Sequence, residues 1–186
     1  MAAKSNQVRI IGGDWRSRRI SFPDHEGLRP SADRVRETLF NWLGQDLSGK
    51  RCLDLFAGSG ALGFEALSRG AASVVMVEKS RRVCEGLRRN AELLAAKNLR
   101  LHCADALEFA TVAAADADAR FDVVFLDPPF RSDMLAQVLP RVVRLLRPGA
   151  QVYIESASAF APADSWRIRR QGRAGQVHYT LVTYGD

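Results

Sequence analysis

The chain has 186 residues, of which 47% are hydrophobic and 26% are charged, and its formal net charge is +6. This length suits one domain that buries about 70% of the surface its unfolded chain would expose, and it leaves little room for a second full domain. No apolar run approaches the roughly 18 residues of a membrane span, and the N-terminus lacks the pattern of a signal peptide. We therefore expect a cytoplasmic protein.

The cysteines and histidines do not have the spacing of a disulfide framework or of a metal site. Cys52, Cys84 and Cys103 are odd in number and far apart, and the three histidines form no ligand pair. We predict three buried, reduced thiols and no bound metal.

The positive charge is concentrated at the two ends of the chain. Residues 1–36 hold eight Lys or Arg against four Asp or Glu, residues 165–186 hold four against one, and the middle is nearly neutral. Most of the excess is arginine, whose planar guanidinium suits phosphate. This distribution favours a polyanion held by the termini, although a generic solubilising surface would give the same pattern.

The N-terminal part predicts a small hairpin followed by a helix. Residues 8–22 alternate in hydrophobicity around a Gly-rich turn, which is typical of a short β-hairpin. Pro30 and Ser31 then indicate a helix start. The helix carries one apolar stripe, consisting of Val35, Leu39, Trp42 and Leu43.

From residue 51 onward, predicted strands and helices alternate, which indicates a parallel sheet. The expected strands are 51–56, 73–78, 99–104, 121–127 and 151–155, and the expected helices are 61–69, 81–96, 105–112 and 132–146. A closing antiparallel hairpin is predicted from 166–170 and 177–184, with a turn at 172–175. The fold class is therefore α/β, with a mostly parallel seven-stranded sheet, preceded by the basic hairpin. We divide the chain into an extension, 1–28, and a main domain, 29–186.

A glycine loop follows the first of these strands. It reads Asp54-Leu-Phe-Ala-Gly58-Ser-Gly60-Ala-Leu-Gly63, and its glycines allow a tight turn and close approach of a ligand to the backbone. The next helix adds its positive end. The spacing also satisfies the dinucleotide pattern, with Glu78 as the acid that binds ribose. A nicotinamide dehydrogenase is therefore an alternative at this point.

Three features favour S-adenosylmethionine (SAM) and a Rossmann-like class I SAM-dependent methyltransferase. Asp54 lies four residues before Gly58, Asp105 and Ala106 follow the third strand where they can bind an adenine, and the closing hairpin is typical of methyltransferase sheets. A solvated acid for Glu78 and a helix N-cap for Asp105 are the structural alternatives. The cofactor-binding residues we predict here are Asp54, Phe56, Ala57, Gly58, Ser59, Gly60, Glu78, Lys79, Asp105 and Ala106.

The sequence Asp127-Pro-Pro-Phe130 at the end of the fourth strand combines a carboxylate, a rigid backbone and an aromatic ring. Two prolines remove backbone donors, so the loop offers mainly hydrogen-bond acceptors, and acceptors suit an amino group. We predict that Asp127, Pro128 and Phe130 are catalytic. The alternative is a turn that only ends the strand.

Taken together, these motifs resemble the RsmD family of bacterial methyltransferases, which act on the N2 amine of a guanine in 16S ribosomal RNA. The discriminating segment is Arg29-Pro-Ser-Ala-Asp-Arg34-Val-Arg-Glu-Thr-Leu-Phe-Asn-Trp-Leu43. The resemblance implies that Arg34, Glu37 and Thr38 border the methionine end of the cofactor. It also implies that the N-terminal hairpin contacts RNA, through Arg16, Arg18 and Arg19. Ser17 departs from the glycine that relatives commonly have there.

The expected reaction is methyl transfer to an exocyclic amine whose hydrogens are accepted by Asp127 and the carbonyl of Pro128, while Phe130 stacks on the extruded base. The expected partner is 16S rRNA, within the small subunit or an assembly intermediate, and we expect a monomer. One alternative is a DNA methyltransferase that acts on adenine N6 or cytosine N4. Another is a SAM-binding RNA chaperone or assembly factor.

Overall fold

In the computed structural model, residues 6–24, 32–116, 118–129, 133–163 and 165–185 are described. The main sheet has seven strands in the order β5-β4-β3-β6-β7-β9-β8. The strands β3 to β7 are parallel to one another, and β9 and β8 complete the sheet as an antiparallel hairpin. The predicted seven-stranded fold is confirmed. Its strands are β3 (Arg51–Asp54), β4 (Ser73–Glu78), β5 (Leu99–Cys103), β6 (Phe121–Leu126), β7 (Leu146–Ser156), β8 (Trp166–Ala174) and β9 (Val177–Tyr184).

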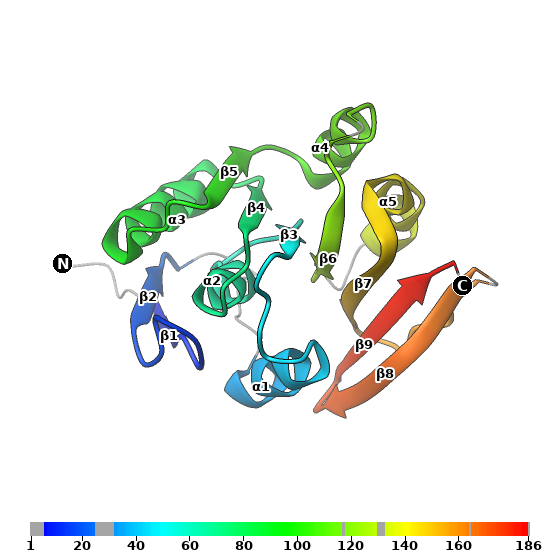
Figure 1. The fold of residues 1–186 in the computed structure, drawn as a ribbon, viewed down its shortest axis with the longest axis horizontal. Helices are drawn as coiled ribbons and strands as arrows, with labels where there is room; N and C mark the ends of the chain where they lie inside the picture. Colours follow the sequence, from blue (N-terminus) through cyan, green and yellow to red (C-terminus); the bar gives the residue numbers. More distant parts are fainter. Residues whose placement is uncertain (1–5, 25–31, 117, 130–132, 164, 186) are drawn as a thin grey trace.

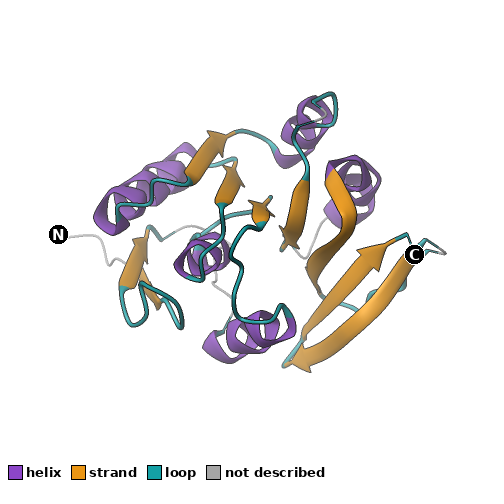
Figure 2. Ribbon diagram, viewed as in Figure 1, coloured by secondary structure: helices purple, strands orange, loops and turns teal. Residues whose placement is uncertain are grey.

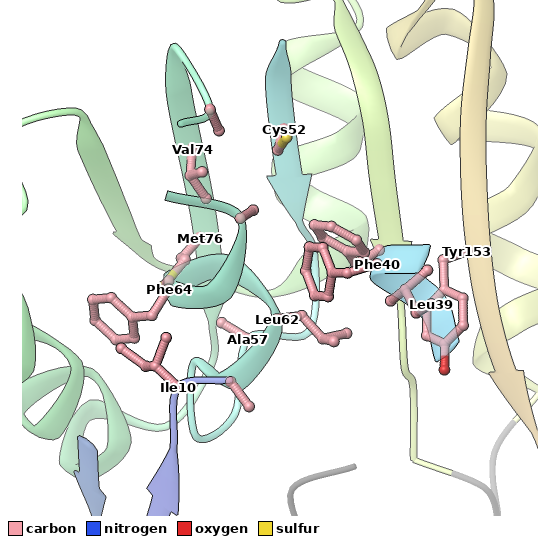
Figure 3. Close-up of a cluster of buried hydrophobic side chains, with 14 of the residues drawn as sticks. Ile10, Leu39, Phe40, Cys52, Ala57, Leu62, Phe64, Val74, Met76 and Tyr153 are labelled. Atoms are coloured by element: carbon pink, nitrogen blue, oxygen red, sulfur yellow. The ribbon is translucent and has the colours of Figure 1, made fainter. Parts of the chain in front are cut away.

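Helices cover both faces of this sheet (Figures 1 and 2). On one face lie α1 (Asp33–Trp42), α2 (Ala61–Ser68) and α3 (Arg81–Leu94), and on the other lie α4 (Ala106–Ala113) and α5 (Met134–Val142). Each layer has its own buried apolar cluster. Figure 3 shows the first cluster, in which Leu39 and Phe40 of α1 lie beside Tyr153 of β7. The strands are almost entirely apolar because both of their faces are covered.

The strand order reverses at β3, which pairs with β4 on one side and with β6 on the other. In open α/β sheets this switch point is where ligands bind, outside the carboxyl ends of the strands. Asp54 ends β3 and Asp127 follows β6 directly, so the topology places both acids at this edge.

The N-terminal hairpin, formed by β1 (Asn6–Arg9) and β2 (Arg19–Phe22), is a separate two-stranded sheet attached to the main domain. Its attachment centres on Glu65 of α2, whose side chain has 0% exposure. This carboxylate accepts hydrogen bonds from the backbone N–H groups of Ile11 and Gly12, each at 2.8 Å, and from Arg69 Nε at 2.8 Å. Arg36 of α1 completes the network at 3.4 Å. The expected boundary at residues 28 and 29 lies outside the described residues.

The predicted end of the helix 132–146 and the predicted start of the strand 151–155 were wrong. The helix ends as α5 at Val142 and continues as a 3-10 turn over Val143–Leu145. Leu146 is instead the first residue of β7, because it pairs with Phe121 of β6.

The predicted turn at 172–175 is mostly strand, since β8 runs to Ala174 and only Gly175 has a positive φ. Gly172 is needed because the ring of Tyr179 lies where its Cβ would be. Glycine signalled a turn here, but the structure uses it for packing.

Cys52 and Cys84 are buried free thiols as predicted, whereas Cys103 is exposed, so that prediction was wrong. Cys103 ends β5, the edge strand of the sheet, where one side of the strand faces solvent. No helix among the described residues is long and apolar enough to cross a membrane.

Candidate active site

The glycine loop connects β3 to α2 through a tight turn at the carboxyl edge of the sheet. Gly58 and Gly60 both have positive φ, 51° and 80°. The loop is fixed by the N–H of Ala57, which donates to Val77 O at 2.9 Å, and by the N–H of Gly60, which donates to Ala57 O at 2.7 Å. A side chain at Gly60 would also collide with Leu87. The loop backbone is therefore bent so that a ligand at this edge can approach it closely.

Gly63 does not face the ligand edge and instead allows α2 to pack on the sheet. A Cβ at this position would collide with Met76 of β4 and would lie 3.2 Å from Asp54 Oδ2. The N–H of Gly63 donates to the same oxygen at 3.0 Å. Gly63 therefore fixes the position of the Asp54 carboxyl group.

Asp54 is 2% exposed. Burial raises its pKa to about 7, the charges of Glu78 and Glu155 add to the rise, and the hydrogen bond from Gly63 opposes it. A carboxylate whose charged form is disfavoured by burial gains most from a positively charged group beside it. Asp54 therefore suits a cationic ligand.

Glu78, at the end of β4, holds the glycine loop and the start of α3 in place. Its Oε2 accepts a hydrogen bond from Gly58 N at 3.0 Å, and its Oε1 accepts one from Ser80 N at 2.7 Å. Glu78 is therefore a partly buried acid whose two oxygens both hold backbone N–H groups. Each oxygen keeps a further lone pair, which a sugar hydroxyl can use.

Asp105 follows β5 and caps α4 through Oδ1, which accepts hydrogen bonds from Leu107 N at 2.9 Å and Glu108 N at 3.3 Å. The N-cap role is therefore confirmed. Oδ2 pairs with Lys79 Nζ at 3.2 Å. Partial burial works against ionisation, but the hydrogen bonds from Lys79 and the helix start outweigh it and lower the pKa of Asp105. Ala106 is the first residue of the helix, so its N–H has no intrahelical acceptor.

The other predicted loop residues have mixed environments. Phe56 is partly buried and packs against the cluster under α4 and α5. Ala57 is 6% exposed and Ser59 is 4% exposed. Ser59 Oγ accepts a weak hydrogen bond from Ala61 N at 3.3 Å. The side chains of Ala57 and Ser59 are therefore nearly closed to solvent.

Asp127 belongs to a carboxylate cluster that the sequence did not predict. Leu126 pairs with Ile154, so Asp127 and Glu155 occupy the next position on the neighbouring strands β6 and β7. Glu155 is 4% exposed, and its Oε1 accepts a hydrogen bond at 2.9 Å from the hydroxyl of the buried Tyr153. Figure 3 shows this hydroxyl pointing past Leu39 of α1.

The carboxylate cluster consists of Asp54, Asp127 and Glu155, and the charge of each acid affects the pKa of its neighbours. The pKa of Asp127 is raised well above its ordinary value, first by burial and then by the charges of Glu155 and Asp54. The pKa of Tyr153 is also raised, by burial and by Glu155, so the phenol keeps its proton. Burial at this edge therefore favours the protonated forms of Asp54 and Asp127. The described residues contain no grouping with the geometry of a metal site.

The α1 helix supplies two kinds of polar residue. Arg34 and Glu37 are exposed, and Thr38 is partly buried with its hydroxyl bonded to Arg34 O at 2.9 Å. Arg36, one of the basic residues counted in the N-terminal excess, is 1% exposed and pairs with Asp33 at 2.6 Å. It also donates to Arg9 O of β1 at 2.9 Å, so it ties α1 to the N-terminal hairpin and is not available to a polyanion.

The predicted RNA-binding arginines lie on the N-terminal hairpin. Arg16, Arg18 and Arg19 are exposed. Arg18 Nη2 donates to Leu93 O at 2.6 Å, near the end of α3. Because α3 starts at the ligand edge and runs back, this contact lies toward the opposite edge of the sheet. Phe130, the third predicted catalytic residue, lies outside the described residues, whereas Pro128 is buried directly after Asp127.

Comparison with known proteins identifies the family. The family model "Conserved hypothetical protein 95" matches residues 8–183. Ribosomal RNA small subunit methyltransferase D of Escherichia coli is 44% identical over 183 residues, which cover 95% of this chain and 90% of that protein. The chain belongs to the ribosomal RNA small subunit methyltransferase D family. The family suggested by the sequence motifs is therefore confirmed.

A further relative and two solved structures are also similar to this chain. The corresponding methyltransferase D of Haemophilus influenzae is 37% identical, over 94% of this chain and 93% of that protein. A solved structure of a putative methyltransferase from Escherichia coli has a TM-score of 0.86 and 42% identity, over 97% of this chain and 99% of that chain. A 16S rRNA N2-guanine methyltransferase of Thermus thermophilus, solved with AdoMet and guanosine, shares the fold with a TM-score of 0.73 at 23% identity, over 98% of this chain and 50% of that chain.

Proposed function

We propose that this protein transfers a methyl group from SAM to the exocyclic N2 amine of a guanine in 16S rRNA. The observation that carries the proposal is the position of Asp127 and Pro128, at the end of β6 and beside the glycine loop, within one carboxylate cluster. The names of the relatives support the methyltransferase activity and the small-subunit RNA. Such a substrate would place the protein in the cytoplasm, within reach of the small subunit or its precursors.

The residues at the ligand edge fit SAM. Glu78 offers acceptors for ribose hydroxyls, and Asp105 Oδ2 with the N–H of Ala106 offers an acceptor and a donor for an adenine edge. The Asp54 carboxylate can stabilise a positively charged group of the cofactor. On α1, we assign Arg34, Glu37 and Thr38 to the methionine end of SAM. When bound, SAM supplies an electrophilic methyl group on a positively charged sulfonium.

Asp127 has the main role toward the acceptor base. The amine of guanine is a poor nucleophile because its lone pair is delocalised into the ring. If Asp127 and the Pro128 carbonyl accept its two hydrogens, the nitrogen becomes more tetrahedral and its lone pair is directed at the methyl group. Such orientation can lower a barrier by about 7 kcal/mol or more.

The proton released after transfer has a path through the cluster. The methylated nitrogen is strongly acidic, so its proton passes to the Asp127 carboxylate, and Glu155 lies on the next strand as a second acceptor. Positive charge at the edge before transfer favours the ionised form of Asp127, and loss of that charge afterwards favours the protonated form. Phe130 is assigned to stacking on the flipped base, a contact worth about 1–3 kcal/mol.

The test is labelled methyl transfer to small subunits, naked 16S rRNA and DNA, each from cells that lack the protein. We expect label in ribosomal RNA and, by mass mapping, on a single guanine N2. Label in DNA would instead show an adenine or cytosine enzyme, and binding without transfer would show an assembly factor.

Asp127→Ala should retain SAM binding and lose transfer by at least two orders of magnitude. Asp116→Ala is the matched control, because Asp116 is an exposed loop residue remote from the cluster. An equal loss of SAM binding and of turnover in Asp127→Ala would contradict the catalytic assignment.

A further inference from the structure

The C-terminal hairpin forms one wall of a hollow that the proposed chemistry does not use. The hollow has a volume of about 380 Å³ and lies between the end of α1, β7, and the β8–β9 hairpin. Figure 1 shows α1 next to one end of this hairpin. The residues that line it are Trp42, Gln151, Ile168, Arg169, Arg170 and Leu181.

The lining combines an aromatic ring, apolar side chains and two guanidinium groups. Trp42 lies over Tyr179 with ring centroids 5.4 Å apart, which holds the indole in position. Ile168 also lines the hollow, but it pairs with Val182 of the cluster under α4 and α5, so its side chain is directed to the other face of the sheet. Arg169 and Arg170 are exposed on the same strand. An aromatic or apolar surface next to arginines is the combination that binds an unstacked base together with its phosphates.

A polar atom on the same face of the sheet lacks a partner. Thr183 is paired with Gln151 in the β7–β9 ladder, and it lies two residues from Leu181, so all three face the same side. The Thr183 hydroxyl is buried and makes no hydrogen bond to any described residue. Buried polar groups are almost always satisfied. This hydroxyl is closed to solvent and does not line the hollow, so the polar groups that the hollow itself offers are Gln151 and the two arginines.

The strand register places the hollow close to the carboxylate cluster. Tyr153 pairs with Leu181, and Leu181 pairs with Arg170. Arg170 is therefore two strand spacings, or about 10 Å, from Tyr153. Two positions further along the strands, Glu155 pairs with Tyr179, on which Trp42 rests. A nucleic acid whose target base reaches Asp127 would pass over this surface.

We propose that this hollow binds the single-stranded RNA next to the target guanine, with a base against Trp42 and phosphates on Arg169 and Arg170. The proposal rests on the proposed function for the identity of the polymer. Charge on an edge strand also protects against aggregation, but that role requires neither the tryptophan nor the hollow. Sequence-specific readers of RNA usually take unpaired bases in this way.

The two basic hairpins would then have different positions relative to the target. Arg18 is held toward the edge opposite the glycine loop, whereas Arg170 lies beside the cluster. The C-terminal hairpin therefore contacts nucleotides adjacent to the guanine, and the N-terminal hairpin reaches more distant RNA.

The test compares Arg169→Gln/Arg170→Gln with Arg100→Gln/Arg144→Gln, which removes two exposed arginines from other parts of the chain. The probes are small subunits and naked 16S rRNA from cells lacking the protein, and SAM binding is measured in parallel. We expect the hollow variant to bind RNA at least tenfold more weakly. Its plot of log affinity against log salt should be shallower by about 1.5, from the loss of two phosphate contacts. KM should rise while kcat and SAM binding stay unchanged.

Ultraviolet cross-linking of the wild-type protein to small subunits gives an independent readout. We expect RNA attached to peptides that contain Trp42 or residues 166–174. A cross-link from these peptides to a ribosomal protein would overturn the proposal, as would equal affinities and salt slopes for the hollow and control variants. Binding does not require methyl transfer, so absence of transfer by the wild type would refute the proposed function and leave this measurement valid.

Discussion

Replacing Asp54 with asparagine should stabilise the cofactor-free protein at neutral pH while removing a group we assign to cofactor binding. The pKa of Asp54 rises from 3.8 to about 7 on folding, because the carboxyl is buried. A group whose pKa is raised on folding contributes full stability only below its unfolded pKa, and this contribution is lost as the pH rises to about 7. Each unit corresponds to about 1.36 kcal/mol. Between pH 5 and 8 the wild type therefore loses about 2 to 3 kcal/mol that Asp54→Asn retains.

The measurement is the free energy of unfolding in urea at pH 5, 6, 7 and 8, with SAM removed. The amide oxygen introduced by Asp54→Asn can still accept the hydrogen bond from Gly63 N, which limits other effects of the substitution. Asp122→Asn is the matched control, because Asp122 accepts from Arg51 N at 2.7 Å but pairs with Arg147 at the other edge. The unfolding free energies of this control show what the loss of a hydrogen-bonded carboxylate costs outside the ligand edge. If the difference in unfolding free energy between Asp54→Asn and the wild type is the same at every pH, Asp54 does not hold a proton in the folded protein.

Two further substitutions test the site. Glu155→Gln removes one of the charges that raise the pKa of Asp127, so the acid limb of the kcat/KM profile should move to lower pH. The control Glu85→Gln changes an exposed acid and should leave this limb unchanged. If the limb stays in place in both variants, Glu155 does not act on Asp127. Gly63→Ala forces a methyl group against Met76 and Asp54. It should lower the free energy of unfolding by about 1–3 kcal/mol and weaken SAM binding, as measured by urea titration and calorimetry.

The ligand edge could be predicted from the sequence because its signals are local. Asp54, Glu78 and Asp105 each follow a short apolar run, and the carboxyl ends of parallel strands meet at one edge of a sheet. The alternation of strands and helices was therefore enough to bring these acids together. The glycine spacing then fixed the loop, since Gly58 and Gly60 both require positive φ.

The carboxylate cluster could not be predicted in the same way. Glu155 is the last residue of the predicted strand 151–155, a position where many acids are solvated. Tyr153 lies within the same strand, where aromatic residues are common. Their roles depend on the β6–β7 register, which sets Glu155 beside Asp127. One signal was available: Tyr153 and Glu155 are two residues apart, so in a strand they share a face.

The burial of Arg36 depends equally on contacts distant in sequence. Its partner Glu65 lies 29 residues away on α2, and no pattern in the sequence links the two residues. Composition counts every arginine as exposed charge, yet this one is enclosed between α1 and the N-terminal hairpin. A count of charges along a sequence therefore overestimates the basic surface, because it includes arginines that are buried in internal ion pairs.

The arrangement of charge also restricts what can enter the site. The chain is basic overall, but its ligand edge gathers the acids Asp54, Glu78, Asp105, Asp127 and Glu155. A phosphate brought to this edge would be repelled, whereas an uncharged base with an amino group would find acceptors. Phosphates are instead favoured on the arginines of the two hairpins, outside the edge. The same polymer would therefore be held by its backbone on the basic surfaces while a single base, turned away from its phosphates, reaches Asp127.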